Sequence, residues 1–126
     1  MYEYSCVIKR IIDGDTVVVD IDLGFDVWLN NQHIRLSGID APEIRTRDLP
    51  EKERGILAKK FVEFHLPVGE TKILRTYEFN EKGKYGRIIG NFLVYNSIAD
   101  MWVDMGMWMI EEGLALKYEP WGEKNV

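Results

Sequence analysis

The stretch "IDGDTVVVDIDL" (residues 12–23) predicts a β-hairpin near the start of the chain. Asp13 and Gly14 are typical turn residues, and from Val17 onward apolar side chains recur at alternate positions, as in a strand with one buried face. The turn does not account for Asp15, which carries a charge into the beginning of the second strand. Two interpretations stay open on these residues alone: a solvated hairpin corner, or half of a cation-binding site.

Outward from this hairpin the chain continues as short strands interrupted by helices. Strands are predicted at residues 4–12, 16–23, 27–29, 33–39, 71–79, 87–95 and 98–103, and helices at residues 48–66 and 105–112. The order contains no alternation of single strands with single helices, which argues against a parallel α/β sheet. The best match is a mainly β fold, a five-stranded Greek-key barrel of the OB type with two helices.

Two local features of this prediction are specific. The segment "NNQ" (residues 30–32) predicts a turn between two strands. Asp48 followed by Glu51 resembles a capping box and sets the beginning of the first helix. The spacing i, i+4, i+7 predicts that the buried stripe of this helix consists of Leu57, Phe61 and Phe64.

Composition and charge limit the class of protein. The 126 residues fit one domain, residues 1–126, and 46% of them are hydrophobic, enough for a core without disulfides. The single cysteine, Cys6, is expected to be buried as a small apolar side chain. No signal peptide or membrane-spanning run is visible, so we expect a cytoplasmic monomer. The net charge of −5 argues against a nonspecific binder of polyanions, although a local basic patch still allows phosphate binding.

Two further stretches concentrate charged residues beside turns. In "RLSGIDAPE" (residues 35–43), Pro42 restricts the residue before it to an extended conformation, so the strand end can direct its polar groups into one cleft. In "KGKYGR" (residues 82–87), basic and aromatic side chains lie between glycines. Each stretch taken singly is also compatible with an ordinary polar turn.

Taken together and in this order, the stretches resemble the staphylococcal nuclease (thermonuclease) family. The resemblance extends from about Val7 to Tyr118 and is carried by "IDGDT" (12–16), "RLSGIDAPE" (35–43), "KYGR" (84–87) and "EEGLA" (111–115). It implies an OB-type barrel with helices, in agreement with the fold predicted from the strand pattern.

The resemblance also implies roles for individual residues. Asp15 and Asp40 match the two carboxylates that bind Ca²⁺, and Ala41 matches the residue that supplies a backbone carbonyl to the same ion. Position 41 is often threonine in the family, and alanine keeps only the carbonyl. Glu43 matches the general base, and Asp13 matches a carboxylate just outside the metal ligands.

The remaining implied roles concern the substrate. Arg35 and Arg87 match the two guanidiniums that bind the scissile phosphate. Lys84 and Tyr85 match residues that contact a terminal phosphate, and Tyr118 is the nearest counterpart of the tyrosines that stack on the base. The implied function is therefore a Ca²⁺-dependent nuclease acting on DNA or RNA, with single-stranded nucleic acid as the expected partner.

Two other functions remain as alternatives. One alternative is an OB module that binds nucleic acid or a protein without catalysis. Such a module does not need the complete set of carboxylates and arginines, and because this chain has the complete set, the enzyme is favoured. A structural Ca²⁺-binding domain leaves the two arginines unexplained. The basic segment "IRTRDLPEKER" (residues 44–54) is equally compatible with a solvated loop and with a flap over the substrate backbone.

Overall fold

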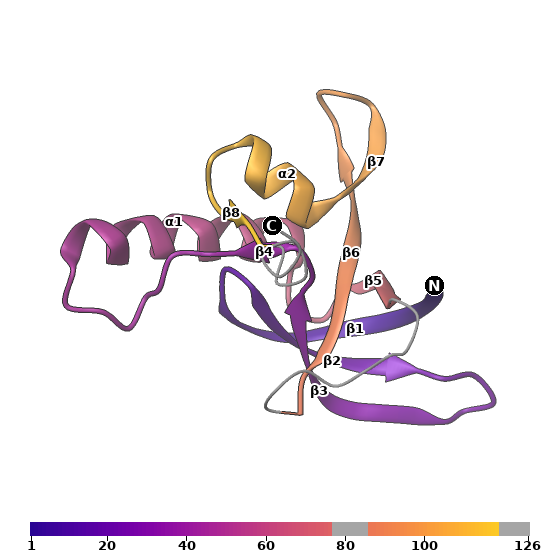
Figure 1. The fold of residues 1–126 in the computed structure, drawn as a ribbon. Coiled ribbons are helices and arrows are strands. Elements are labelled where there is room, and N and C mark those ends of the chain that lie inside the picture. Colours follow the sequence, from indigo (N-terminus) through magenta and orange to yellow (C-terminus); the bar gives the residue numbers. More distant parts are fainter. Residues whose placement is uncertain (77–85, 119–126) are drawn as a thin grey trace, which may run out of the picture.

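The computed structural model describes residues 1–76 and 86–118, which form a curled β-sheet with two helices on one side of it (Figure 1). The strands follow the alternating apolar pattern of the sequence, and each helix begins at a capping aspartate, of which Asp48 was predicted. The elements are β1 (Tyr2–Asp13), β2 (Thr16–Asp22), β3 (Trp28–Leu36), β4 (Ile39–Asp40), α1 (Leu49–His65), β5 (Thr71–Thr76), β6 (Ile88–Asn96), β7 (Met101–Asp104), α2 (Met105–Glu111) and β8 (Leu116–Lys117).

Five of the strands close into a barrel. The main sheet has the order β3-β2-β1-β5-β6-β7, and β3 also pairs with β6, so that β1, β2, β3, β5 and β6 form a ring. All neighbouring pairs are antiparallel except β3–β6, which is parallel over Ile34–Leu36 and residues 88–90. This arrangement, with α1 between the third and fourth strands of the ring, confirms the predicted OB-like barrel with two helices.

Both helices begin at a side-chain cap. The Asp48 carboxylate accepts a hydrogen bond from the backbone N–H of Glu51 at the start of α1, and Asp104 caps the N–H of Met107 at the start of α2. The predicted capping box is only half formed, because the Glu51 side chain accepts from Glu43 instead of returning to its own cap. Figure 1 shows α2 next to the short β4–β8 pair.

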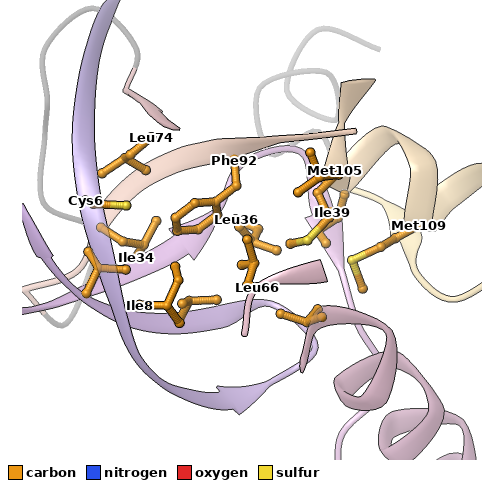
Figure 2. Packing of buried hydrophobic residues seen from close by; sticks show 14 of the residues in the cluster. Cys6, Ile8, Ile34, Leu36, Ile39, Leu66, Leu74, Phe92, Met105 and Met109 are labelled. Carbon is orange, nitrogen blue, oxygen red and sulfur yellow. The ribbon is translucent and has the colours of Figure 1, made fainter. Parts of the chain in front are cut away.

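The core fills the barrel and the space under the two helices (Figure 2). Cys6 is fully buried, as predicted, and burial raises the pKa of its thiol to about 12. The largest fully buried side chains come from strands on every side of the ring and from α2, so the core joins all layers of the fold. They include Phe92, Ile8, Ile34, Leu36, Ile39, Leu66, Leu74, Met105 and Met109.

Two local predictions are wrong. Residues 30–32 do not form a turn: β3 continues through them, and Asn31, at φ 54°, lies where the pairing of β3 with β2 shifts register. Asparagine tolerates this left-handed conformation. The turn-like residues therefore form a local shift of register inside one continuous strand.

The predicted buried stripe of α1 is also wrong. Leu57 and Phe64 are 56% and 79% exposed, and Phe61 is only partly buried. The buried face of α1 consists of Gly55, Ala58 and Val62. Small residues occupy this face because α1 lies against the backbone of the segment that follows β4.

The β2–β3 hairpin is long and extends on the side of the barrel away from α1 (Figure 1). Its tip exposes apolar side chains, among them Phe25, which is fully exposed, and Trp28. Within residues 1–76 and 86–118, neither helix has the length and apolar character needed to span a membrane.

Candidate active site

One cleft of about 540 Å³ lies where the β1–β2 turn, β3, β4, the beginning of β6 and α1 meet. It brings together six of the residues singled out in the sequence, although they come from separate segments. Those residues are Asp15, Arg35, Asp40, Ala41, Glu43 and Arg87. The cleft is open to solvent and lined largely by charged and polar groups, which suits a charged ligand.

Asp15 is held firmly at the base of the cleft. Its backbone N–H donates to the Asp13 carboxylate at 3.0 Å, and its own carboxylate accepts the Ala41 N–H at 3.0 Å. The Thr16 hydroxyl donates to its other carboxylate oxygen at 3.3 Å, and the Asp15 carbonyl accepts the Leu36 N–H at 2.9 Å. The Asp15 carboxylate, which the hairpin turn alone did not explain, is therefore held in place by contacts with the β1–β2 turn, β3 and the segment after β4.

Arg35 lies between the two predicted cation ligands. One of its guanidinium nitrogens, Nη2, is 3.6 Å from the Asp15 carboxylate and 3.8 Å from that of Asp40. The other, Nη1, donates to the Leu36 carbonyl at 2.9 Å. The side chain is 16% exposed, so its orientation is restrained on three sides. A rigid guanidinium at the floor of a cleft is suited to binding phosphate oxygens.

Arg87 enters the same cleft from the neighbouring strand. It directly precedes β6, where Ile88 is paired with Ile34 and Ile89 with Arg35. Arg35 on β3 and Arg87 just before the adjacent strand β6 therefore lie close to each other, and both line the cleft. Closure of the barrel by the β3–β6 pair is what brings them together.

Glu43 projects from the segment that connects β4 to α1. Its backbone N–H donates to the Glu51 carboxylate at 3.1 Å, while the residue itself is exposed. Gly55 of α1 lies directly beneath: a Cβ placed on it would be 2.7 Å from the Pro42 carbonyl oxygen and 2.8 Å from that of Glu43. The helix thus supports the backbone that positions the Glu43 side chain.

This contact gives a first prediction, for Gly55→Ala. In an exposed helix interior this substitution stabilises the protein by about 1 kcal/mol, because alanine has the higher helix propensity. Here the added methyl group overlaps two backbone oxygens, so we expect the free energy of unfolding to fall by about 1 to 3 kcal/mol instead. Urea denaturation measures it, with Glu53→Ala, at an exposed α1 position, as the control. A more stable Gly55→Ala variant would show that the helix does not press on this segment.

The Asp13 carboxyl is the most perturbed acid of the cleft. Its burial, together with the adjacent Asp15 carboxylate, raises its pKa from the ordinary 3.8 to about 6. Two carboxylates this close repel each other unless a proton or a cation offsets the charge. The acidic end of the cleft is therefore an unfavourable place for a second anion and a favourable one for a cation.

The side chains and carbonyl groups that line the cleft limit the kind of cation that it can hold. Within the described residues, no group of three or more His, Cys, Asp and Glu side chains could hold a metal ion. Two carboxylates, Asp15 and Asp40, line the cleft together with Ala41, whose backbone carbonyl is the third oxygen donor expected from the family resemblance. An all-oxygen set of this size fits a hard cation such as Ca²⁺ that takes its remaining ligands from water and substrate, and does not fit a soft metal.

Of the three other residues predicted to contact the substrate, the structure describes only Tyr118. Lys84 and Tyr85 lie outside the described residues. Tyr118 does not line the cleft, but its ring centroid is 6.0 Å from the Arg35 Cζ atom, and its backbone N–H donates to the Gly38 carbonyl at 2.8 Å. The ring is therefore placed beside the arginine at the edge of the cleft, 46% of its surface exposed.

The cleft also contains Lys59 of α1, for which no role was predicted from the sequence. Arg45 lines the cleft as well, and it belongs to the basic segment 44–54 that was predicted to be either a solvated loop or a flap over the substrate. The spacing of Gly55, Ala58 and Val62 was the available signal for Lys59: small residues on one helix face indicate close packing, and Lys59 follows directly on that face.

The fold and the cleft define an OB-like barrel whose acidic and arginine residues suit a phosphate and a hard cation. A model of the family described as staphylococcal nuclease homologue matches residues 33–126. The chain belongs to this family.

Individual relatives agree with this assignment. The chain is 32% identical to a thermonuclease of Staphylococcus intermedius over 95% of its own length and 64% of the relative's. It is 31% identical to a thermonuclease of Staphylococcus hyicus, with 90% and 59% covered. An uncharacterized protein of Methanocaldococcus jannaschii is 34% identical, with 75% and 50% covered. The chain thus spans between half and two thirds of the length of these relatives.

Proposed function

We propose that this chain is a Ca²⁺-dependent nuclease that hydrolyses phosphodiester bonds of DNA or RNA. The observation that carries the proposal is the cleft, which gathers charged residues from separate segments of the fold, among them Asp15, Asp40, Glu43, Arg35 and Arg87. Similarity to proteins named thermonucleases supports the same reaction class. We expect the substrate to be single-stranded and the enzyme to be a monomer.

In this proposal the arginines bind the scissile phosphate. As water attacks phosphorus, negative charge grows on the oxygens that remain, and preorganised donors at that position lower the barrier. Arg35 is already restrained by Asp15, Asp40 and the Leu36 carbonyl, so little reorganisation is needed when substrate binds. Arg87, which directly precedes the adjacent strand β6, provides the second guanidinium.

Glu43 accepts a proton from the attacking water. Its carboxylate is exposed at the cleft and its backbone is held by Glu51 and by the contact with Gly55. A solvent-accessible carboxylate on a fixed backbone suits a general base that works on a water molecule.

Asp15, Asp40 and the Ala41 carbonyl are the groups that hold Ca²⁺. When bound, a hard divalent cation neutralises phosphate charge and polarises the phosphoryl group. The chain's own contribution is to keep the two carboxylates on either side of Arg35, where a phosphate approaches both the carboxylates and the guanidinium.

The test is incubation with single-stranded DNA, double-stranded DNA and RNA in Ca²⁺, in Mg²⁺ and in EDTA. We expect cleavage in Ca²⁺ and no cleavage in EDTA. Absence of cleavage with every divalent ion, combined with measurable binding of oligonucleotides, would contradict the nuclease and favour an OB module that only binds nucleic acid.

A second prediction concerns Arg35→Lys. Lysine keeps the positive charge but cannot form two parallel hydrogen bonds to a phosphate. We expect the cleavage rate to fall on the order of a hundredfold, as for other preorganised donors. The matched control is Arg75→Lys, because Arg75 forms its ion pair with Glu3 on the barrel surface and does not line the cleft. An unchanged rate in the folded Arg35→Lys variant would remove Arg35 from phosphate binding.

A further inference from the structure

The last strand of the main sheet has a free edge beside α2. One edge of β7 pairs with β6, and no other strand within residues 1–76 and 86–118 pairs with the opposite edge. Two hollows, of about 230 and 440 Å³, lie next to this strand and share Asp104, Met107 and Glu111. We refer to β7 and these two hollows as the β7 surface. It shares no lining residue with the candidate active site and is therefore distinct from the cleft.

The exposed side chains of the β7 surface are mainly apolar and aromatic. Trp102 and Met107 are more than half exposed, and the Trp102 ring lies 5.7 Å from the ring of Tyr95, its partner on β6. Ile98 and Met101 are also exposed in this region. Figure 1 shows that the β6–β7 hairpin projects beyond the rest of the sheet. Exposed apolar groups that gather beside a groove mark an interaction site more often than the same groups scattered singly.

The charges of the β7 surface are almost all negative. Residues 95–112 contain four carboxylates and no lysine, arginine or histidine. The carboxylates are Asp100, Asp104, Glu111 and Glu112, and within the described part of the chain none of them forms an ion pair. Among the described residues that line the two hollows, Lys117 is the only cation. Such a surface repels nucleic acid and the same surface of a second copy, and it attracts a basic partner.

The two faces of β7 differ in character. Because side chains alternate along a strand, Trp102 and Asp104 lie on one face, and Met101 and Val103 lie on the other. A basic side chain next to the first face meets an aromatic ring and a carboxylate, both of which attract a cation. An apolar side chain suits the second face. A strand added to the free edge therefore fits best when basic and apolar residues alternate along it.

We propose that the β7 surface binds an extended segment of a partner protein in which basic and apolar residues alternate. The backbone of this segment adds a strand to the free edge of β7, and its apolar side chains contact Met101 and Met107. Its basic side chains lie against Trp102, Asp104 and Glu111. No residue of the cleft takes part, so this binding does not depend on the proposed nuclease function.

The probe is a fluorescein-labelled peptide of eight residues in which lysine and valine alternate, and fluorescence anisotropy measures its binding. A second peptide has the same side chains but a methyl group on every backbone nitrogen, which removes its hydrogen bonds to a strand edge and keeps its charge. A third peptide has glutamate in place of lysine. We expect the first peptide to bind, and the other two to bind more weakly by about tenfold or more.

Variants test where the peptide binds. Trp102→Ala should weaken binding about tenfold, because it removes both apolar area and the ring that attracts a cation. Its control is Phe25→Ala, which removes a fully exposed ring at the tip of the β2–β3 hairpin and should change nothing. Glu111→Gln should weaken binding about threefold, the effect of one exposed ion pair, and Glu53→Gln should have no effect. We expect all four variants to cleave nucleic acid as the wild type does.

Three results would overturn this inference. The first is that the wild type fails to bind the lysine–valine peptide, or binds it and its methylated form equally. The second is that an oligonucleotide displaces the peptide, because the surface would then belong to the nucleic-acid site. The third is self-association in sedimentation velocity that Trp102→Ala abolishes, because a second copy of this chain would then occupy the surface.

Discussion

Glu43→Gln is expected to lower the rate of cleavage by about 10² to 10⁴-fold while leaving the affinity for an oligonucleotide nearly unchanged. The amide has the shape of the carboxylate but cannot accept a proton from water at neutral pH. Removal of a negative charge beside the phosphate does not weaken binding, and it can strengthen it slightly. The measurement pairs the initial rate with fluorescence anisotropy in the same Ca²⁺ buffer.

The control for this variant is Glu53→Gln, an exposed residue of α1 that does not line the cleft. It makes the same chemical change on the same side of the molecule and should behave as wild type. If Glu43→Gln cleaves as fast as Glu53→Gln, the Glu43 side chain is not the general base. Its role is then limited to the turn, where its backbone N–H donates to Glu51.

Asp40→Asn is expected to reduce cleavage to the rate measured in EDTA. The side chain of Asp40 is 61% exposed, so the variant should fold normally, but it loses one of the two carboxylates that we propose as cation ligands. Calcium titration in the presence of a nucleotide should show the weaker cation site directly. Oligonucleotide affinity in EDTA should not fall, because a negative charge has been removed from the cleft.

The matched change is Asp26→Asn at the tip of the β2–β3 hairpin. Asp26 is exposed, has φ 61°, and lies outside the cleft, and asparagine tolerates this conformation. It should leave both cleavage and calcium titration unchanged. Full Ca²⁺-dependent activity in Asp40→Asn would place the cation elsewhere.

The sequence predicted those parts of the site that lie in short contiguous stretches. Asp15 could be singled out because the preceding turn does not account for a charge at the start of a strand. Arg35 and Asp40 could be singled out because they bracket the end of a predicted strand. The residues that the sequence passed over, Lys59 and Gly55, act through tertiary contacts of α1. The available signal for Lys59 was the run of small residues on one face of the helix, which its exposed neighbour Lys60 does not share.

The errors in the fold have the same origin. Periodicity favoured large apolar residues as the buried face of α1, but the helix lies against the turn at Gly14 and the backbone after β4, where only small residues fit. In β3 the residue Asn31 favours a turn, but it lies inside a strand because the residues on both sides of it pair with β2. Pairing between segments overrode local preference in both places.

The parallel β3–β6 pair has a kinetic consequence. Its strands are separated by α1 and β5, so it closes a long loop, and such contacts form late when a chain folds. A refolding intermediate with the first three strands in place already holds Asp15 and Arg35, but Arg87 arrives only when β6 docks. In stopped-flow refolding, recovery of phosphate-ligand binding should therefore lag behind the formation of β-structure. It should coincide with the last refolding phase. Binding of a nucleotide then reports the moment at which the barrel closes.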